Sequence, residues 1–260
     1  MKNLRKYGKA PFSIAVIHGG PGAAGQMAPV ARELATGWGV LEPIQTAMSL
    51  ESQVKELKTV LENNADLPVT LIGFSWGAWL SFIVAARYPA IIKKLILVGS
   101  GPYEVKYATK IQEARLGRLS EEERTEFESI VRTLGANTAE DKNTLFARLG
   151  ALASKADAYD PEMDKSETID CRSDIFQSVW ADAAELRSSG KLLKLGRHIK
   201  CPVVAIHGDY DPHPAEGVQK PLSAILKNFR FIPLKNCGHE PWIERQARKE
   251  FFRILKEQLH

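Results

Sequence analysis

Residues 68–89 read PVTLIGFSWGAWLSFIVAARYP, and this stretch decides the fold. Its first part is a short apolar run with β-branched residues, which predicts a buried strand. Gly73-Phe74-Ser75-Trp76-Gly77 follows as a G-x-S-x-G motif, and the apolar residues after it predict a helix that stops at Pro89. A serine at the tip of so tight a turn has strained backbone geometry, and its hydroxyl projects above the edge of the sheet. The glycines on either side let the strand and the helix approach closely.

The same alternation of strand and helix continues on both sides of this stretch. Strands are predicted at 13–20, 39–44, 68–75, 93–102, 201–209 and 229–234, and helices at 26–35, 50–63, 76–89, 215–226 and 242–259. Alternating strands and helices indicate an α/β fold with a mostly parallel sheet and helices on both faces. Because only about eleven residues precede the first of these strands, we expect about six strands.

Residues 103–197 interrupt the alternation, because they contain no strand-like run and are charged and helical in spacing. We therefore predict an α/β core from residues 1–100 and 198–260 and an all-helical cap from residues 101–197. Both ends of the cap attach where Ser75 should lie. It should cover the carboxyl ends of the strands, where open α/β sheets bind ligands.

The composition excludes several classes of protein. The 260 residues are 44% hydrophobic and 25% charged, as in a soluble globular protein, and the net charge of +4 comes without a concentrated basic stripe. Nucleic acid is therefore not an expected partner. Cys171, Cys201 and Cys237 are isolated, which predicts neither a disulfide nor a metal site, and the absence of a GxGxxG turn agrees with no cofactor.

The apolar runs are too short for a signal peptide or a membrane span. We expect a cytoplasmic protein without a membrane partner, acting on a small molecule or a short peptide. The sequence leaves its oligomeric state unknown.

Ser75 is the candidate nucleophile, and two backbone N–H groups are candidates for stabilising an oxyanion. One belongs to Trp76, at the start of the helix after the serine. The other is expected in the turn His18-Gly19-Gly20-Pro21-Gly22. Pro21 has no N–H, so we assign this second donor to Gly20. His18 is interpreted as structural, holding the turn by a hydrogen bond.

A carboxylate and an imidazole follow two late strands, in the order Ser–Asp–His. Serine needs a base to take its proton, and the base needs a carboxylate on its far nitrogen. His239 is the candidate base. Asp211 is preferred to Asp209 as the acid because it lies further out along the loop, and Glu104 is a distant third. The other histidines, His198, His207, His213 and His260, are interpreted as structural or solvated, and Cys237 as a small packing residue.

These four motifs, with a helical insertion between the Ser and Asp segments, resemble the α/β-hydrolase superfamily. HGGPG together with GxSWG resembles its proline iminopeptidase-like branch. The resemblance implies Ser75, Asp211 and His239 as the catalytic triad and Gly20 and Trp76 as the oxyanion donors. The chain departs from the branch at Phe74, where iminopeptidases typically carry Gly. The cap glutamates that hold the substrate amine in that branch have no matching position among Asp174, Asp182 and Glu185.

The sequence thus predicts a cofactor-free serine hydrolase that forms an acyl-enzyme on a small carboxylic ester. A proline iminopeptidase-like aminopeptidase is the alternative. A non-catalytic ligand-binding protein, or a lyase or carbon–carbon bond hydrolase, is a further one. Serine at position 75 disfavours the superfamily members that use an aspartate nucleophile. Phe74, Trp76 and Trp180 are the predicted substrate-binding residues, whereas Trp79 and Phe82 are expected in the core.

Overall fold

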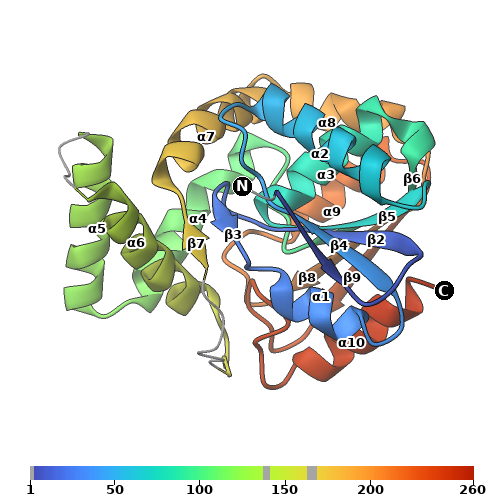
Figure 1. Ribbon diagram of the computed structural model, residues 1–260. Coiled ribbons are helices and arrows are strands. Elements are labelled where there is room, and N and C mark those ends of the chain that lie inside the picture. The colour runs from blue at the N-terminus through green and yellow to red at the C-terminus, as the bar shows by residue number, and fades with distance from the viewer. Residues whose placement is uncertain (1–2, 137–140, 163–168) are drawn as a thin grey trace.

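The computed structural model describes residues 3–136, 141–162 and 169–260 (Figure 1). Seven strands form one sheet in the order β1-β4-β2-β5-β6-β8-β9. Neighbouring strands pair parallel, except that β1 runs antiparallel to β4 at one edge. In chain order these strands are β1 (Leu4–Tyr7), β2 (Phe12–Ile17), β4 (Gly39–Pro43), β5 (Val69–Phe74), β6 (Ile92–Val98), β8 (Val203–Gly208) and β9 (Phe229–Leu234). The predicted fold class is confirmed.

Helices cover both faces of the sheet, because successive side chains of a strand point to opposite faces. In β2, Ala15 and Ile17 pack in one apolar cluster while Ile14 and Val16 pack in the other. The first cluster also contains apolar residues of α2 (Leu50–Asn64), α3 (Trp76–Arg87) and α9 (Glu216–Ile225). The second contains residues of α1 (Ala28–Leu34) and α10 (Arg248–Glu257). The two layers lie on opposite sides of the sheet in Figure 1.

One strand more than the expected number is present. β1 consists of Leu4-Arg5-Lys6-Tyr7, whose two central charges gave no apolar signal. It is held at the sheet edge by the wholly buried Glu42 of β4, which accepts a hydrogen bond from Tyr7 Oη at 2.6 Å and lies 3.5 Å from Arg5. Charged residues are common on exposed edge strands. A short antiparallel strand therefore precedes the first parallel one.

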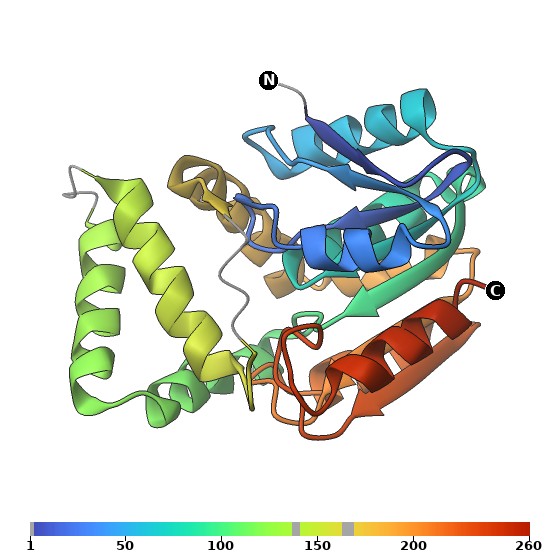
Figure 2. The same cartoon turned by 60° about the horizontal axis from the view of Figure 1, so that its bottom comes forward.

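The chain between β6 and β8 contains helices that pack in two different ways. Its helices are α4 (Val105–Arg118), α5 (Glu121–Gly135), α6 (Lys142–Asp157), α7 (Ser173–Ser188) and α8 (Lys191–Leu195). Buried residues of α7 and α8, such as Val179 and Leu192, join the cluster of α2 and α3. α5 and α6 instead pack against each other around Phe127, Ile130 and Leu152. They lie beyond the carboxyl ends of the strands (Figure 2).

Polar side chains mark where several helices begin. Ser49 accepts a hydrogen bond from the N–H of Ser52 at the start of α2, and Asp141 accepts one from Thr144 at the start of α6. Ser120 and Glu123 form a reciprocal capping box at the start of α5. These side chains satisfy N–H groups that have no partner inside the helix.

The segment expected to be all-helical also carries a short strand. β7 (Asp170–Cys171) pairs antiparallel with β3 (Ala23–Ala24), and the N–H of Arg172 donates to the carbonyl of Gly22 at 2.9 Å. Two residues that pair only through their backbone leave no periodic signal in the sequence. This small sheet joins the predicted cap to the chain just after the glycine turn.

Within the described ranges, no helix is both long enough and apolar enough to cross a membrane. α3 contains the most continuous apolar run and has 12 residues. It is short because its role is to follow the serine turn and pack against the sheet.

Candidate active site

Ser75 occupies the strained turn that the sequence predicts. It joins β5 to α3 with φ 51° and ψ −115°, in a region that side chains other than glycine rarely adopt. Its N–H donates to the carbonyl of Val98 on the adjacent strand at 3.0 Å. A Cβ atom on Gly77 would overlap the carbonyl oxygens of Ile17 and His18, so only glycine lets α3 pass so close to β2. The strain is therefore maintained by neighbouring backbone.

The two expected oxyanion donors, Gly20 and Trp76, both line the same cavity as Ser75. Within the described residues, neither N–H donates to a protein oxygen. The glycine turn is held from behind, because His18 Nδ1 donates to the carbonyl of Gly19 at 2.8 Å and its Nε2 accepts the N–H of Gln45 at 3.3 Å. Burial lowers the pKa of His18 to about 4, so the ring is neutral. The turn has the hydrogen bond expected from His18.

Gln45 links the two donor segments. Its Nε2 donates to the carbonyl of His18 at 2.8 Å, and its Oε1 accepts the indole N–H of Trp76 at 2.8 Å. All three side chains are buried. The glycine turn and the start of α3 are thus held together by a polar network that the sequence analysis did not foresee.

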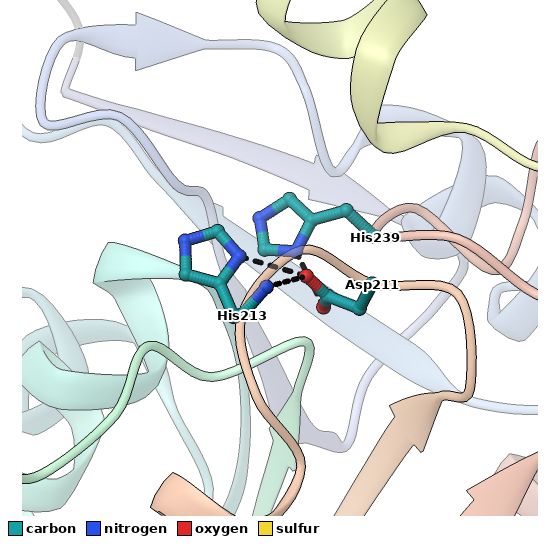
Figure 3. A group of neighbouring side chains, drawn as sticks. All are labelled: Asp211, His213 and His239. Carbon is teal, nitrogen blue, oxygen red and sulfur yellow. Dashed lines mark hydrogen bonds and ion pairs between the residues drawn. The ribbon is translucent and has the colours of Figure 1, made fainter. Parts of the chain in front are cut away.

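Asp211 contacts His239, whereas Asp209 does not take part. The Nδ1 atom of His239 donates to Oδ2 of Asp211 at 2.7 Å, and both residues are buried (Figure 3). Asp209 is exposed and accepts the N–H of Cys237 at 3.2 Å. Glu104 precedes α4 and pairs with Lys106. Asp211 follows β8 and His239 follows β9, so the carboxylate and the imidazole lie at the carboxyl ends of adjacent parallel strands.

His239 also lies against the strand that neighbours β5. Gly99, just after β6, has φ +50°, and a Cβ there would be 2.7 Å from the carbonyl oxygen of His239. Phe74, the residue before Ser75, packs its ring 4.8 Å from the imidazole of His239. Among the described residues, no hydrogen bond joins Ser75 Oγ to His239. Such catalytic hydrogen bonds are often long without substrate and tighten when it binds.

Two further histidines surround Asp211, and both were expected to be merely structural or solvated. His213 donates from its backbone N and from Nδ1 to Oδ1 of Asp211, at 2.8 and 2.7 Å. Its ring stacks on His239 with centroids 4.4 Å apart, and each ring turns its other nitrogen away from the carboxylate (Figure 3). His207 Nε2 donates to the carbonyl of His213 at 2.8 Å and lies 3.5 Å from Asp211. The Asp-Pro-His spacing after β8 was the signal that could have identified His213.

The electrostatics of this group distinguish its members. Burial opposes the charge of Asp211, but the neighbouring histidines, His239 first, hold its pKa well below the ordinary value. Burial would also lower the pKa of His239, yet the charge and hydrogen bond of Asp211 outweigh it and raise that pKa. For His213 burial dominates and lowers the pKa to about 4. His239 is therefore the imidazole whose protonated form is stabilised.

Asp211, His213 and His239 could also be considered as metal ligands, since one ligand atom of each lies within 4.8 Å of the others. Both Nδ1 atoms donate to Asp211, however, so each carries a proton instead of a lone pair, and the other nitrogen of each ring points away from the carboxylate (Figure 3). The group has the chemistry of an acid that orients two imidazoles.

The loop that carries His239 is fixed by residues of the preceding helical segment. The N–H of His239 donates to the carbonyl of Asp157 at 2.9 Å, at the end of α6. The carboxylate of Asp157 pairs with Arg115 through two bonds of 2.7 and 2.6 Å. Wholly buried Glu244 accepts the N–H groups of Gly238, Tyr159 and Asp160 at 2.7–2.8 Å. The position of His239 therefore depends on chain segments far away in sequence.

A cavity of about 830 Å³ opens beside Ser75, with walls contributed by α3–α7. Trp76 and Trp180, the two tryptophans expected to bind substrate, are among its lining residues. Trp79, expected only in the core, also lines it, and its ring stacks on Trp180 with centroids 6.0 Å apart and 3° between the planes. Phe74 differs from the expectation: it is wholly buried and is not among the lining residues, because it packs against His239 and Trp242.

The acids considered as ammonium ligands do not line the cavity. Asp174 pairs with Arg172, and Asp182 accepts the N–H of Leu50 at 3.3 Å. Within the described ranges no Asp or Glu side chain lines the cavity, whereas Arg115 and Arg187 do. A negatively charged or neutral ligand therefore suits this cavity better than a cationic one.

The family of the chain follows from a family model. The model for the alpha/beta hydrolase fold matches residues 13–246, which include the serine turn, the acid and the imidazole. The chain belongs to this family.

Individual relatives share about a quarter of the aligned residues with this chain. The chain is 24% identical over 201 residues to the "Biotin biosynthesis bifunctional protein BioHC" of Teredinibacter turnerae, covering 75% of the chain and 33% of that protein. It is 26% identical over 181 residues to the "Pimeloyl-[acyl-carrier protein] methyl ester esterase" of Nitrosospira multiformis, covering 66% of the chain and 62% of that protein. The chain thus spans less than two thirds of the length of each relative.

Solved structures share the fold at low sequence identity. VinJ superposes with a TM-score of 0.70 at 18% identity, over 98% of this chain and 93% of its own. The proline iminopeptidase of Mycobacterium smegmatis superposes with a TM-score of 0.61 at 18% identity, over 98% and 93%. At this identity the likeness extends to the fold alone.

Proposed function

We propose that this protein is a serine hydrolase that cleaves small carboxylic esters through an acyl-enzyme on Ser75. The observation that carries the proposal is the strained turn at Ser75, beside a cavity that Gly20 and Trp76 also line, and the N–H groups of these two residues donate to no protein oxygen among the described residues. A partly exposed serine that lines one cavity with two such donors suits acyl transfer, because the tetrahedral intermediate carries its negative charge on one oxygen.

In the proposed reaction, His239 takes the proton of Ser75 while Oγ attacks the ester carbonyl. The N–H groups of Gly20 and Trp76 stabilise the oxyanion, and protonated His239 gives its proton to the departing alcohol. Water then attacks the acyl-enzyme with the same base, which releases the acid and restores Ser75. Asp211 holds the Nδ1–H tautomer of His239 and stabilises the imidazolium through the 2.7 Å hydrogen bond.

His239, rather than His213, is assigned as the base. Both rings bond to Asp211 through Nδ1. A base must hold the proton during the reaction, and the raised pKa of His239 supports this, whereas the pKa of His213 near 4 opposes it. His213 is assigned a positioning role, as a second donor that fixes the carboxylate of Asp211.

Ester hydrolysis is preferred to the aminopeptidase alternative. An aminopeptidase of the iminopeptidase-like branch needs an acid near the nucleophile to hold a free ammonium group. Asp174 and Asp182 are engaged elsewhere, and the described cavity wall carries arginines instead. The aromatic wall formed by Trp79, Trp180 and Phe176 suits an apolar acyl chain, and one relative is named as a methyl ester esterase.

Two measurements test this proposal together. The first is a substrate screen with p-nitrophenyl and methyl esters of graded chain length beside proline and alanine arylamides. We expect esters to turn over and arylamides to be inert, and the reverse result would support the aminopeptidase.

The second measurement is labelling by a fluorophosphonate, with Ser75→Ala as the matched control. We expect labelling of the unmodified protein only, and a loss of turnover by about 10⁶-fold in the variant. Labelling of the variant would refute the serine mechanism. A protein that neither labels nor turns over any substrate would be a binding protein that retains these residues.

A further inference from the structure

Two arginines line the cavity beside Ser75, and their surroundings differ sharply. Arg115 of α4 forms a two-bond ion pair with Asp157, so its charge is neutralised within the protein. Arg187 of α7 forms no ion pair or hydrogen bond with its side chain among the described residues. Among the described residues, the cavity therefore contains one arginine, Arg187, whose charge is not paired with a carboxylate.

Arg187 is also partly buried, which is unusual for an arginine without an ion pair. The side chain is only partly exposed, and its Nε atom is inaccessible and has no acceptor. Burial lowers the pKa of Arg187, and no carboxylate in the described part of the chain counteracts that effect. Two acids of the same helix have other partners: Asp182 accepts the N–H of Leu50, and Asp174 forms an ion pair with Arg172. A buried donor without an acceptor costs stability, so its presence beside a cavity is consistent with an acceptor that a ligand supplies.

The guanidinium is held in place by an aromatic surface. Its central carbon lies 5.3 Å from the centre of the Trp79 ring, which stacks on Trp180, which in turn stacks on Phe176 at 5.7 Å. Trp79 is one helical turn beyond Ser75 on α3 and is fixed by a 3.0 Å hydrogen bond from its indole N–H to the carbonyl of Gly101. An apolar chain that starts at Ser75 can therefore follow this surface towards Arg187.

We propose that Arg187 binds a carboxylate group of the substrate, so that the preferred esters are half-esters of dicarboxylic acids. The planar fork of a guanidinium matches the two oxygens of a carboxylate. The reacting ester group would lie at Ser75 and the free carboxylate at Arg187, with the connecting methylene chain on the tryptophans. This assignment rests on the proposed ester hydrolysis and names its substrate class.

The test compares monomethyl esters of C4 to C10 dicarboxylic acids with methyl esters of monocarboxylic acids of equal length. The quantity measured is the ratio of kcat/KM for the half-ester to that for the neutral ester. We expect the ratio to exceed one at the best chain length and to fall about ten- to hundredfold in Arg187→Met. Arg187→Lys should retain part of the preference, because it keeps the charge without the fork.

Arg132→Met is the matched control, since it removes the same charge from an exposed position on α5 that does not line the cavity. We expect it to leave the ratio unchanged. A ratio that is the same in the unmodified protein and in Arg187→Met would overturn the proposal. So would an equal loss with both variants, which would indicate only the net charge of the protein.

Binding distinguishes failure of this inference from failure of the proposed hydrolysis. Titration of Ser75→Ala with the same monomethyl esters, followed calorimetrically, measures the anion site without turnover. Binding that Arg187→Met weakens at least tenfold in this background supports the site even if no ester is cleaved. Equal affinity for half-esters and neutral esters would refute it even if both are hydrolysed.

Discussion

Ser75 and His239 are positioned by different kinds of contact. The turn at Ser75 is enclosed by backbone from β2 and β6 and by glycine on α3, all within the two layers of the α/β core. His239 is positioned by hydrogen bonds to Asp211, to the carbonyl of Asp157 and, through its loop, to Glu244. The first arrangement is steric and local, whereas the second is polar and reaches into the helical segment between β6 and β8.

This difference indicates how each part should respond to change. Close backbone packing leaves no room for an added atom. A substitution at the serine turn should therefore lower mainly the free energy of unfolding. A hydrogen-bonded loop can shift slightly and remain folded. A substitution near His239 should therefore lower mainly kcat. Substitutions at the two sites can therefore test this contrast.

Among the changes that test this contrast, Asp211→Asn should have the largest effect. The neutral amide no longer stabilises the imidazolium of His239 and favours the wrong tautomer, so we expect kcat to fall by up to about 10⁴. Steady-state kinetics on the best ester measures this. Asp209→Asn is the matched control on the same loop, and it should act mainly on stability because Asp209 only accepts the N–H of Cys237. A larger loss of kcat at Asp209 would reverse the assignment.

Gly77→Ala should show the steric side of the contrast. The added methyl group would overlap the carbonyl oxygens of Ile17 and His18, so α3 would have to move away from β2. We expect a loss of about 3 kcal/mol in the free energy of unfolding. Urea unfolding followed by tryptophan fluorescence measures it. Unchanged stability would mean that the close approach of strand and helix is not needed.

Glu244→Ala should show the polar side. It leaves the N–H groups of Gly238, Tyr159 and Asp160 without their acceptor, and we expect a loss of about 2 kcal/mol in stability. It should also lower kcat, and the fall in kcat should be the larger of the two effects, because the loop of His239 loses its anchor. Urea unfolding and ester kinetics separate the two effects. Normal kcat in a destabilised variant would show that the loop is positioned without Glu244.

The pH dependence should report His239 alone. Burial lowers its pKa, but Asp211 raises it above the ordinary value of about 6.5, and the base must be unprotonated. We therefore expect kcat/KM to fall about tenfold per pH unit below a midpoint higher than 6.5. A pH–rate profile of the unmodified protein measures this. A midpoint near 4 would instead indicate His213 as the base.

The smallest effect is expected from Gly150→Ala in α6. A Cβ there meets no atom within 4 Å, and the residue is exposed in a helix interior. Alanine should stabilise the protein by about 0.5–1 kcal/mol, because it loses less backbone entropy than glycine. Urea unfolding measures the gain. If Gly150→Ala instead lowered the free energy of unfolding, the loss expected from Gly77→Ala could not be attributed to steric overlap.

The fold could be predicted because its determinants are local. The apolar runs of β2, β5, β6 and β8 and the glycines around Ser75 are visible in single stretches of sequence. β1 could not be predicted, because its Arg5 and Lys6 are tolerated only at an edge where Glu42 and Tyr7 meet. β7 could not be predicted either, because its pairing depends on a segment that follows β2.

The candidate site could be predicted only where a motif marks it. Ser75, Asp211 and His239 follow strand ends, so the carboxyl edge of the sheet brings their loops together. The contacts of His213 with Asp211 depend on how one turn folds back on itself. Trp79 was assigned to the core from its helical spacing, which is correct for its burial but misses the cavity on its other side. Arg187 carries no sequence signal, since only packing shows that no carboxylate among the described residues pairs with it.

The small sheet of β3 and β7 has a consequence for the order of events in a catalytic cycle. It fastens residues 170–172 to the chain directly after Gly20, with the N–H of Arg172 bonded to the carbonyl of Gly22. If the helical segment moved outward at this edge, these hydrogen bonds would break, and the glycine turn would be left with the support of His18 and Gln45 alone. Under the proposed mechanism, opening at this edge would therefore loosen one of the two proposed oxyanion donors. A molecule that admitted substrate by this route would regain the full support of the glycine turn only when the strands paired again.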